Sequence, residues 1–291
     1  MLAHGPISPA NLWTTWTLDP LMLLALVTMG ALYARGLAEL WKVRSGRTVS
    51  RRRAASFFAG LLLLLFALAS PLDALAGELF SAHMVQHLVL MLGAAPLLVY
   101  GAPLLPVSLA LPAGARRRLH SVAGSPPGRR TRRLLLALPV VWILHAVVLW
   151  MWHLPTLYEL GLSNEYLHAL EHATFLGTAT LFWILVIGSL RRRDLDRGLA
   201  AFLTFATALQ SGALGVVLTF AARPLYEAHG NSAAWGLDRF ADQQLAGAIM
   251  WVPSGIVYLV TIAVLLYRWL EAMDAQPSLS SVRPLRREIP E

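Results

Sequence analysis

The chain has 291 residues, of which 57% are hydrophobic and only 14% are charged, and its mean hydropathy is +0.58. A typical soluble domain has about a quarter of its residues charged, so this chain is too apolar for that class. The net charge of +8 does not indicate a nucleic-acid partner, because the arginines form short clusters between apolar runs, as topological charges do. The absence of cysteine excludes disulfides, thiolate metal sites and cysteine-based redox chemistry.

Apolar runs of about 20 residues, the length that crosses a bilayer as a helix, recur along the whole chain. We interpret seven of them as transmembrane helices of one all-α domain that comprises residues 1–291. The third is expected to continue irregularly to Leu111, because the prolines from Pro96 onward would bend or end a helix. In chain order the predicted spans are 18–41, 54–72, 81–100, 134–152, 167–190, 198–221 and 241–267.

Lysine and arginine gather in alternate connections between these spans. All 24 of them except Arg223 and Arg239 fall on one side of the predicted topology. Because basic connections stay in the cytoplasm, we expect an external N-terminus, a cytoplasmic C-terminus and a multi-pass location in the inner (plasma) membrane. The N-terminal segment lacks the basic stretch of a signal peptide, so the first apolar run is expected to remain as an anchor.

Two histidine pairs begin the third and fifth spans, both of which enter from the external side. His83 and His87 are four residues apart, as are His168 and His172, so each pair lies on one helix face. His153 ends the fourth span on the same side. Ionisable groups inside a span are costly and are by default functional candidates. The pattern predicts a metal site with the two pairs as first-choice ligands and His153 next.

Methionines near these histidines offer a second type of ligand. Met84 and Met91 lie in the third span, and Met151 lies two residues before His153. Thioether sulfur suits Cu(I), and imidazole suits copper, zinc, iron and nickel, so a site without cysteine favours copper. The alternative for each methionine is ordinary apolar packing.

Four further polar residues fall at the same depth. Gln86 and Glu171 each precede the second histidine of a pair and could orient the imidazoles, and Glu171 could itself bind the metal. Asp73 ends the second span and Asp242 begins the seventh. Each is either an interfacial charge or a group that admits or tunes the ion.

Several segments, taken together and in order, resemble the CtaG family of membrane proteins, which is linked to cytochrome c oxidase assembly. The resemblance covers roughly residues 15–270. It implies a seven-span protein that supports maturation of a haem-copper oxidase by supplying copper, with an oxidase subunit and an extracytoplasmic copper donor as partners. The matching segments are Ser70-Pro71-Leu72-Asp73, His83 to His87 continuing through Ala95-Pro96 to Gly101-Ala102-Pro103, Trp152-His153-Leu154-Pro155 with Tyr158, His168 to His172, Asp242 to Gly247, and Met250-Trp251-Val252-Pro253.

Three other functions fit parts of the pattern. His168, Glu171 and His172 match the inverted zinc-hydrolase motif, in which the glutamate is the general base, so an intramembrane zinc hydrolase is an alternative. Histidines on facing helices could instead ligate haem. A copper permease would need polar steps through the inner half of the bundle, which is almost purely apolar. We expect a non-enzymatic copper-binding assembly factor in the lipid bilayer, with zinc or haem as alternative cofactors.

Overall fold

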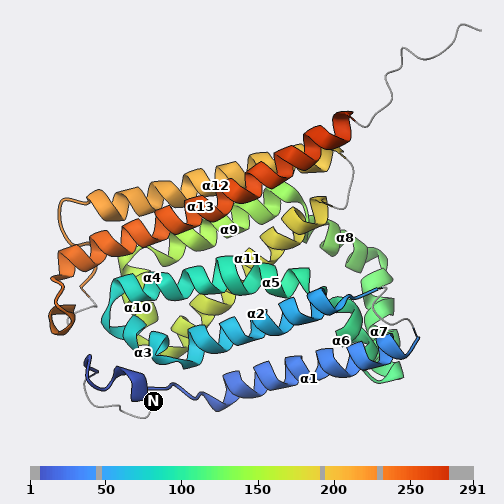
Figure 1. Cartoon of the computed structure of the whole chain (residues 1–291), viewed down its shortest axis with the longest axis horizontal. Helices are drawn as coiled ribbons and strands as arrows, with labels where there is room; N and C mark the ends of the chain where they lie inside the picture. Colours follow the sequence, from blue (N-terminus) through green and yellow to red (C-terminus); the bar gives the residue numbers. More distant parts are fainter. Residues whose placement is uncertain (1–6, 44–47, 191–193, 228–231, 275–291) are drawn as a thin grey trace, which may run out of the picture.

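Long helices lie side by side in the computed structural model, which describes residues 7–43, 48–190, 194–227 and 232–274 (Figure 1). Within those ranges six helical segments are long and apolar enough to cross a membrane, and a bent pair brings the total to seven if it is one span. This confirms the predicted all-helical membrane fold. The six segments are α1 (Pro20–Val43), α2 (Arg51–Ala69), Phe80–Tyr100, α11 (Glu165–Ser189), α12 (Asp194–Phe220) and α13 (Arg239–Asp274).

The fourth predicted span, 134–152, differs most from the structure. Its straight part, α9 (Leu138–Trp152), has 15 residues and is about 22 Å long, which is short of a hydrocarbon core of about 30 Å. The preceding helix α8 (Pro126–Leu135) meets α9 at a 60° bend. Pro139 in the first turn of α9 starts the new helix, so the two leucines at the predicted start of the span belong to α8 instead.

The third span is irregular, as predicted. It consists of α4 (Phe80–Leu88), a π-helical stretch η2 (Val89–Ala94) and α5 (Ala95–Tyr100). The π turns end two residues before Pro96, which has no N–H to continue the α-helical ladder. The chain turns again at Ala102, where φ is +51°, into α6 (Leu104–Ala110).

Helix α6 packs against α1, as a glycine on α1 shows. A Cβ at Gly36 would overlap the backbone carbonyl of Pro106, so only glycine permits this approach of the two helices. The hydroxyl of Tyr33 on α1 also donates to the carbonyl of Gly101, at 2.9 Å. Helix α1 is therefore attached to the bundle mainly through the segment that follows α5.

Short helices lie at the two ends of the bundle (Figure 1). One end has η1 (Leu12–Thr14), α3 (Pro71–Glu78), α10 (Pro155–Ser163) and η3 (Ser232–Trp235), and the other has α7 (Ala113–Gly124) with α8. Helices α7 and α8 carry seven arginines and no acidic residue. Other basic residues of the predicted cytoplasmic side lie outside the described residues: Arg44, Arg47, Arg191, Arg192, Arg193, Arg283, Arg286 and Arg287.

Helix α11 is the centre of the largest buried apolar cluster. It contributes Phe175, Ala179, Phe182, Trp183 and Val186 to that cluster. Residues of α4, α5, α9, α12 and α13 belong to the same cluster, so polar side chains on the core faces of α4 and α11 are shielded from lipid and water. This arrangement positions the histidine pairs.

Candidate metal centre

Helix α4 is held at its start by a carboxylate from another helix. Asp242 on α13 is 1% exposed and accepts hydrogen bonds from the backbone N–H of Phe80 (2.7 Å) and of Ser81 (3.1 Å). The Ser81 hydroxyl donates to the same carboxylate at 2.5 Å. Helix N-termini favour such anionic acceptors. Asp242 therefore fixes the first turn of the helix that carries His83 and His87, a role that its position in the sequence does not indicate.

Helix α11 begins with a side-chain cap of its own. The Asn164 side chain accepts from the backbone N–H groups of Tyr166 (2.9 Å) and Leu167 (3.1 Å). This start places His168 in the first turn of α11, and Glu171 and His172 in the next.

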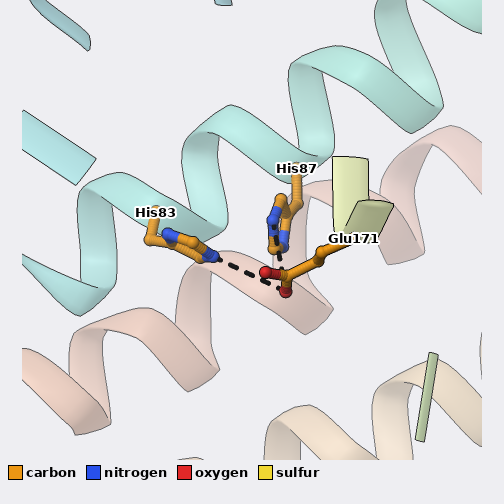
Figure 2. A group of neighbouring side chains, drawn as sticks. All are labelled: His83, His87 and Glu171. Atoms are coloured by element: carbon orange, nitrogen blue, oxygen red, sulfur yellow. Dashed lines mark ion pairs between the residues drawn. The ribbon is translucent and has the colours of Figure 1, made fainter. Parts of the chain in front are cut away.

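His83 and His87 project from one face of α4 toward Glu171 on α11 (Figure 2). The Nε2 atoms of His83 and His87 lie 3.8 and 3.7 Å from Oε1 of Glu171, and one ligand atom from each of the three residues lies within 4.8 Å of the others. All three are at most 2% exposed. Donor atoms that share a tetrahedral ion at about 2.0–2.2 Å are about 3.3–3.6 Å apart, so a small inward movement would complete a metal site.

Two members of this cluster, Glu171 and His87, have polar atoms without ordinary partners among the described residues. Within the described part of the chain, neither oxygen of Glu171 and neither ring nitrogen of His87 has a hydrogen-bond partner. Buried polar groups are normally hydrogen-bonded, because leaving them unpaired costs free energy. Two imidazoles and a carboxylate are a donor set suited to zinc, copper or iron, so the residues fit a bound metal ion.

The second histidine pair borders this centre. The ring centroids of His168 and His172 are 4.2 Å apart, and those of His87 and His172 are 5.4 Å apart. His172 is 8% exposed, and its Nε2 has no hydrogen-bond partner among the described residues. Neither His168 nor His172 joins the close group. Among the described residues, the three whose ligand atoms all lie within 4.8 Å of one another are His83, His87 and Glu171. The structure therefore places the pair beside the group of His83, His87 and Glu171.

His153, the fifth predicted ligand, is held in a defined tautomer. Its Nδ1 lies 2.7 Å from the Leu149 carbonyl oxygen, so Nδ1 carries the proton and donates it. The buried Nε2 is then an acceptor, and no described residue donates to it. The rings of His153 and His87 both contact Phe175, at centroid distances of 6.2 and 4.6 Å. His153 lies at the edge of the cluster with a ligand atom available.

The methionines lie in apolar surroundings. Met84 and Met91 are buried members of the largest core cluster, and the partly buried Met151 packs against it. The backbone carbonyl of Met91 accepts from the Trp183 indole at 2.9 Å. These contacts fit the packing alternative for the three residues.

Gln86 points away from the imidazoles. Its amide nitrogen donates to the Ala67 carbonyl (2.7 Å) and to Asp73 (2.8 Å), which joins α4 to α2 and α3. Burial raises the pKa of the Asp73 carboxyl, and hydrogen bonds from Thr17 and Gln86 oppose that shift. The charge of the nearby His168 opposes it as well.

Other residues around the centre have no signal in the sequence pattern. A Cβ added at Gly161 on α10 would lie 3.2 Å from Oε2 of Glu171, so this glycine leaves room for the carboxylate. The Tyr158 ring lies 5.3 Å from the His83 ring, and the Tyr226 hydroxyl donates to the His153 carbonyl at 2.7 Å. Of these, only Tyr158 falls in a segment that resembles the CtaG family. Local periodicity does not predict contacts between distant helices.

Comparisons with known proteins agree with the resemblance in the sequence. The family model for cytochrome c oxidase caa3 assembly factors, CtaG, matches residues 31–272. Uncharacterized proteins of Mycobacterium bovis and Mycobacterium tuberculosis are each 27% identical over 286 residues, covering 91% of this chain and 40% of theirs. An uncharacterized protein of Mycobacterium leprae is 24% identical over 285 residues, covering 91% of this chain and 41% of its own. The chain thus spans about two-fifths of the length of these relatives. No solved structure matches it.

Proposed function

The chain belongs to the family of cytochrome c oxidase caa3 assembly factors, and from that premise we propose that it holds copper in the membrane for insertion into a haem-copper oxidase. The observation that carries the proposal is the buried group of His83, His87 and Glu171, whose ligand atoms face one another across α4 and α11. The group would hold the ion, and the ion is cargo.

Copper is favoured by the donor chemistry. Imidazole binds copper well, and among divalent first-row metals copper has the highest affinity for a given nitrogen and oxygen site. His172 and His153 each have a buried Nε2 beside the group and could complete the coordination. Zinc and haem are the alternative cofactors, and metal analysis and absorption spectroscopy of the purified protein distinguish them from copper.

The geometry does not favour the zinc-hydrolase alternative. In that motif the two histidines on α11 would hold zinc and Glu171 would act on a bound water. The Glu171 carboxylate instead faces His83 and His87 on α4, among the ligand atoms of the candidate site.

The proposed partners are a copper donor outside the cytoplasm and a subunit of the oxidase. The arginine-rich helices α7 and α8 lie at the end of the bundle opposite α3 and α10 (Figure 1). If the basic end is cytoplasmic, the ends of α4 and α11 that carry the histidine pairs lie nearer the external side, where such a donor would approach.

Metal analysis of the purified protein tests the proposal. We expect about one copper per chain after loading, and its loss when His83→Ala and His87→Ala are combined. His120→Ala, which removes an exposed imidazole from α7, is the matched control and should keep the copper. Full copper content in the double variant would overturn the assignment. Zinc in the wild type, with a hydrolytic activity that Glu171→Gln abolishes, would favour the hydrolase. A Soret absorption band would favour haem.

A further inference from the structure

The candidate site is closed off from both lipid and water. His83 is 0% exposed, His87 2% and Glu171 1%. A cation that reaches these ligands must shed its water in steps, because a bare charge in an apolar bundle is very costly. A chain of side-chain ligands between the surface and the centre would lower that cost.

His168 is placed to be the first of these ligands. Of the five imidazoles it alone is half-buried, while the other four are buried. It lies in the first turn of α11, which begins with the exposed residues Glu165 and Tyr166. Its ring faces the His83 ring at a centroid distance of 5.4 Å and an angle of 26°. His168 therefore borders both the end of the bundle and the buried site.

The nitrogen that would bind a cation is available on His168. Its Nε2 is buried and has no hydrogen-bond partner among the described residues, and the same is true of Nε2 of His172 one turn further along α11. The two rings are 4.2 Å apart. His172 in turn lies 5.4 Å from His87, which is a ligand of the buried site. Unpaired imidazole nitrogens thus continue from the half-buried end to the centre.

The carboxylate of Asp73 lies near the helix that carries His83 and His87. Asp73 on α3 is half-buried, and it is joined to α4 through Gln86, which lies between His83 and His87 in the sequence. Gln86 donates to Asp73 at 2.8 Å and holds the carboxylate at the edge of α4. Negative charge beside an opening raises the local concentration of cations.

We propose that His168, assisted by Asp73, is the entrance ligand of the buried metal site and passes the cation, through His172 or directly, to His83, His87 and Glu171. The inference rests on the proposed function. The transfer is a ligand exchange: the ion gains a bond to the next imidazole as it loses the previous one, and its oxidation state does not change. His168 therefore controls how fast the site fills and does not hold the resident ion.

The rate of copper loading and the final copper content can be measured separately on the full chain in lipid nanodiscs. The protein is mixed with Cu(I) that is carried by a coloured chelator. Colour loss gives the loading rate, and elemental analysis of the separated protein gives the final copper content. We expect His168→Ala to reach the wild-type content but to load about tenfold more slowly. Asp73→Asn keeps an acceptor for Gln86 and should slow loading with a weaker dependence on salt. His120→Ala and Glu165→Gln, both of exposed residues, are the matched controls.

Two results would overturn the inference. If both His168→Ala and Asp73→Asn load at the wild-type rate, neither residue serves the entrance. If folded His168→Ala ends with less copper than the wild type, His168 is a ligand of the resident ion and not an entrance. A wild-type protein that binds no copper is a different result, because it refutes the proposed function itself.

Discussion

Glu171 is a buried carboxylate in unfavourable surroundings. A carboxylate that is 1% exposed and has no hydrogen-bond partner among the described residues lowers the stability of the metal-free protein. A cation bound between Glu171, His83 and His87 would offset that cost. Stability and metal binding should therefore respond in opposite ways when the carboxylate is removed.

Glu171→Gln tests this coupling. We expect the metal-free variant to unfold at a temperature no lower than the wild type, because it loses a buried charge. The increase in melting temperature on adding copper should be much smaller, because loss of a ligand weakens binding by about 10- to 100-fold or more. Thermal unfolding with and without copper measures both effects, with Glu165→Gln as the exposed control. An undiminished copper-dependent increase would contradict a ligand role for Glu171.

Gly161 gives a test that leaves every ligand in place. In Gly161→Ala the new Cβ would lie 3.2 Å from Oε2 of Glu171, so the carboxylate must shift away from its present position. We expect copper affinity to fall by about tenfold. Gly177→Ala on α11 is the control, because no atom lies within 4 Å of its Cβ, and it should stabilise the helix by about 0.5–1 kcal/mol. Equal copper affinity in the two variants would show that the position of the carboxylate is unimportant.

At the scale of helices, the site depends on how α4 and α11 are held. Helix α4 is capped by Asp242 from α13 and is followed by the π stretch η2, whereas α11 is capped by its own Asn164. The orientation of His83 and His87 therefore depends on a residue more than 150 positions away in the chain. This makes Asp242 a positioning residue.

Asp242→Ala should weaken both the fold and the site. Loss of its three hydrogen bonds at the start of α4 is expected to lower the free energy of unfolding by about 2 kcal/mol or more. Copper affinity should fall as well, because the first turn of α4 would no longer be fixed. Asp238→Ala removes a more exposed cap, which accepts from the N–H of Ala241, and should cost about 1 kcal/mol with copper affinity unchanged. Unchanged affinity in Asp242→Ala, by titration of the folded protein, would refute the positioning role.

The helices and their contacts differ in how far they could be predicted from the sequence. Apolar runs and the four-residue spacing of histidines are local patterns, so they predicted the spans and the shared face of His83 and His87. The partner of Glu171 depends on how α11 rotates against α4, and the hydrogen bonds of Gln86 depend on α2 and α3. Such features are set by packing between helices, which periodicity does not encode.

For the whole molecule, charge separates the two ends of the bundle. The arginines of α7 and α8 lie at the end opposite α3 and α10, and basic connections are retained in the cytoplasm. We therefore expect α10 to lie on the external side of the membrane. Because the chain has no cysteine, a single introduced cysteine reports its own accessibility without background.

Labelling of two single-cysteine variants tests this orientation. In right-side-out membrane vesicles treated with an impermeant maleimide, Ser163→Cys at the end of α10 should react at once. Ser121→Cys on α7 should react only after the membrane is opened with detergent. Both serines are exposed, so a difference reports the side of the membrane. The reverse pattern would place the histidines toward the cytoplasm and contradict a donor outside it.

Anomalous X-ray diffraction at the copper absorption edge, from crystals of the copper-loaded protein, would locate the bound ion and identify its ligands. We expect one strong peak between α4 and α11, about 2.0–2.2 Å from Nε2 of His83, Nε2 of His87 and a carboxylate oxygen of Glu171. A copper peak only elsewhere on the chain, with Nε2 of His83 and Nε2 of His87 still 3.8 and 3.7 Å from Oε1 of Glu171, would contradict this assignment.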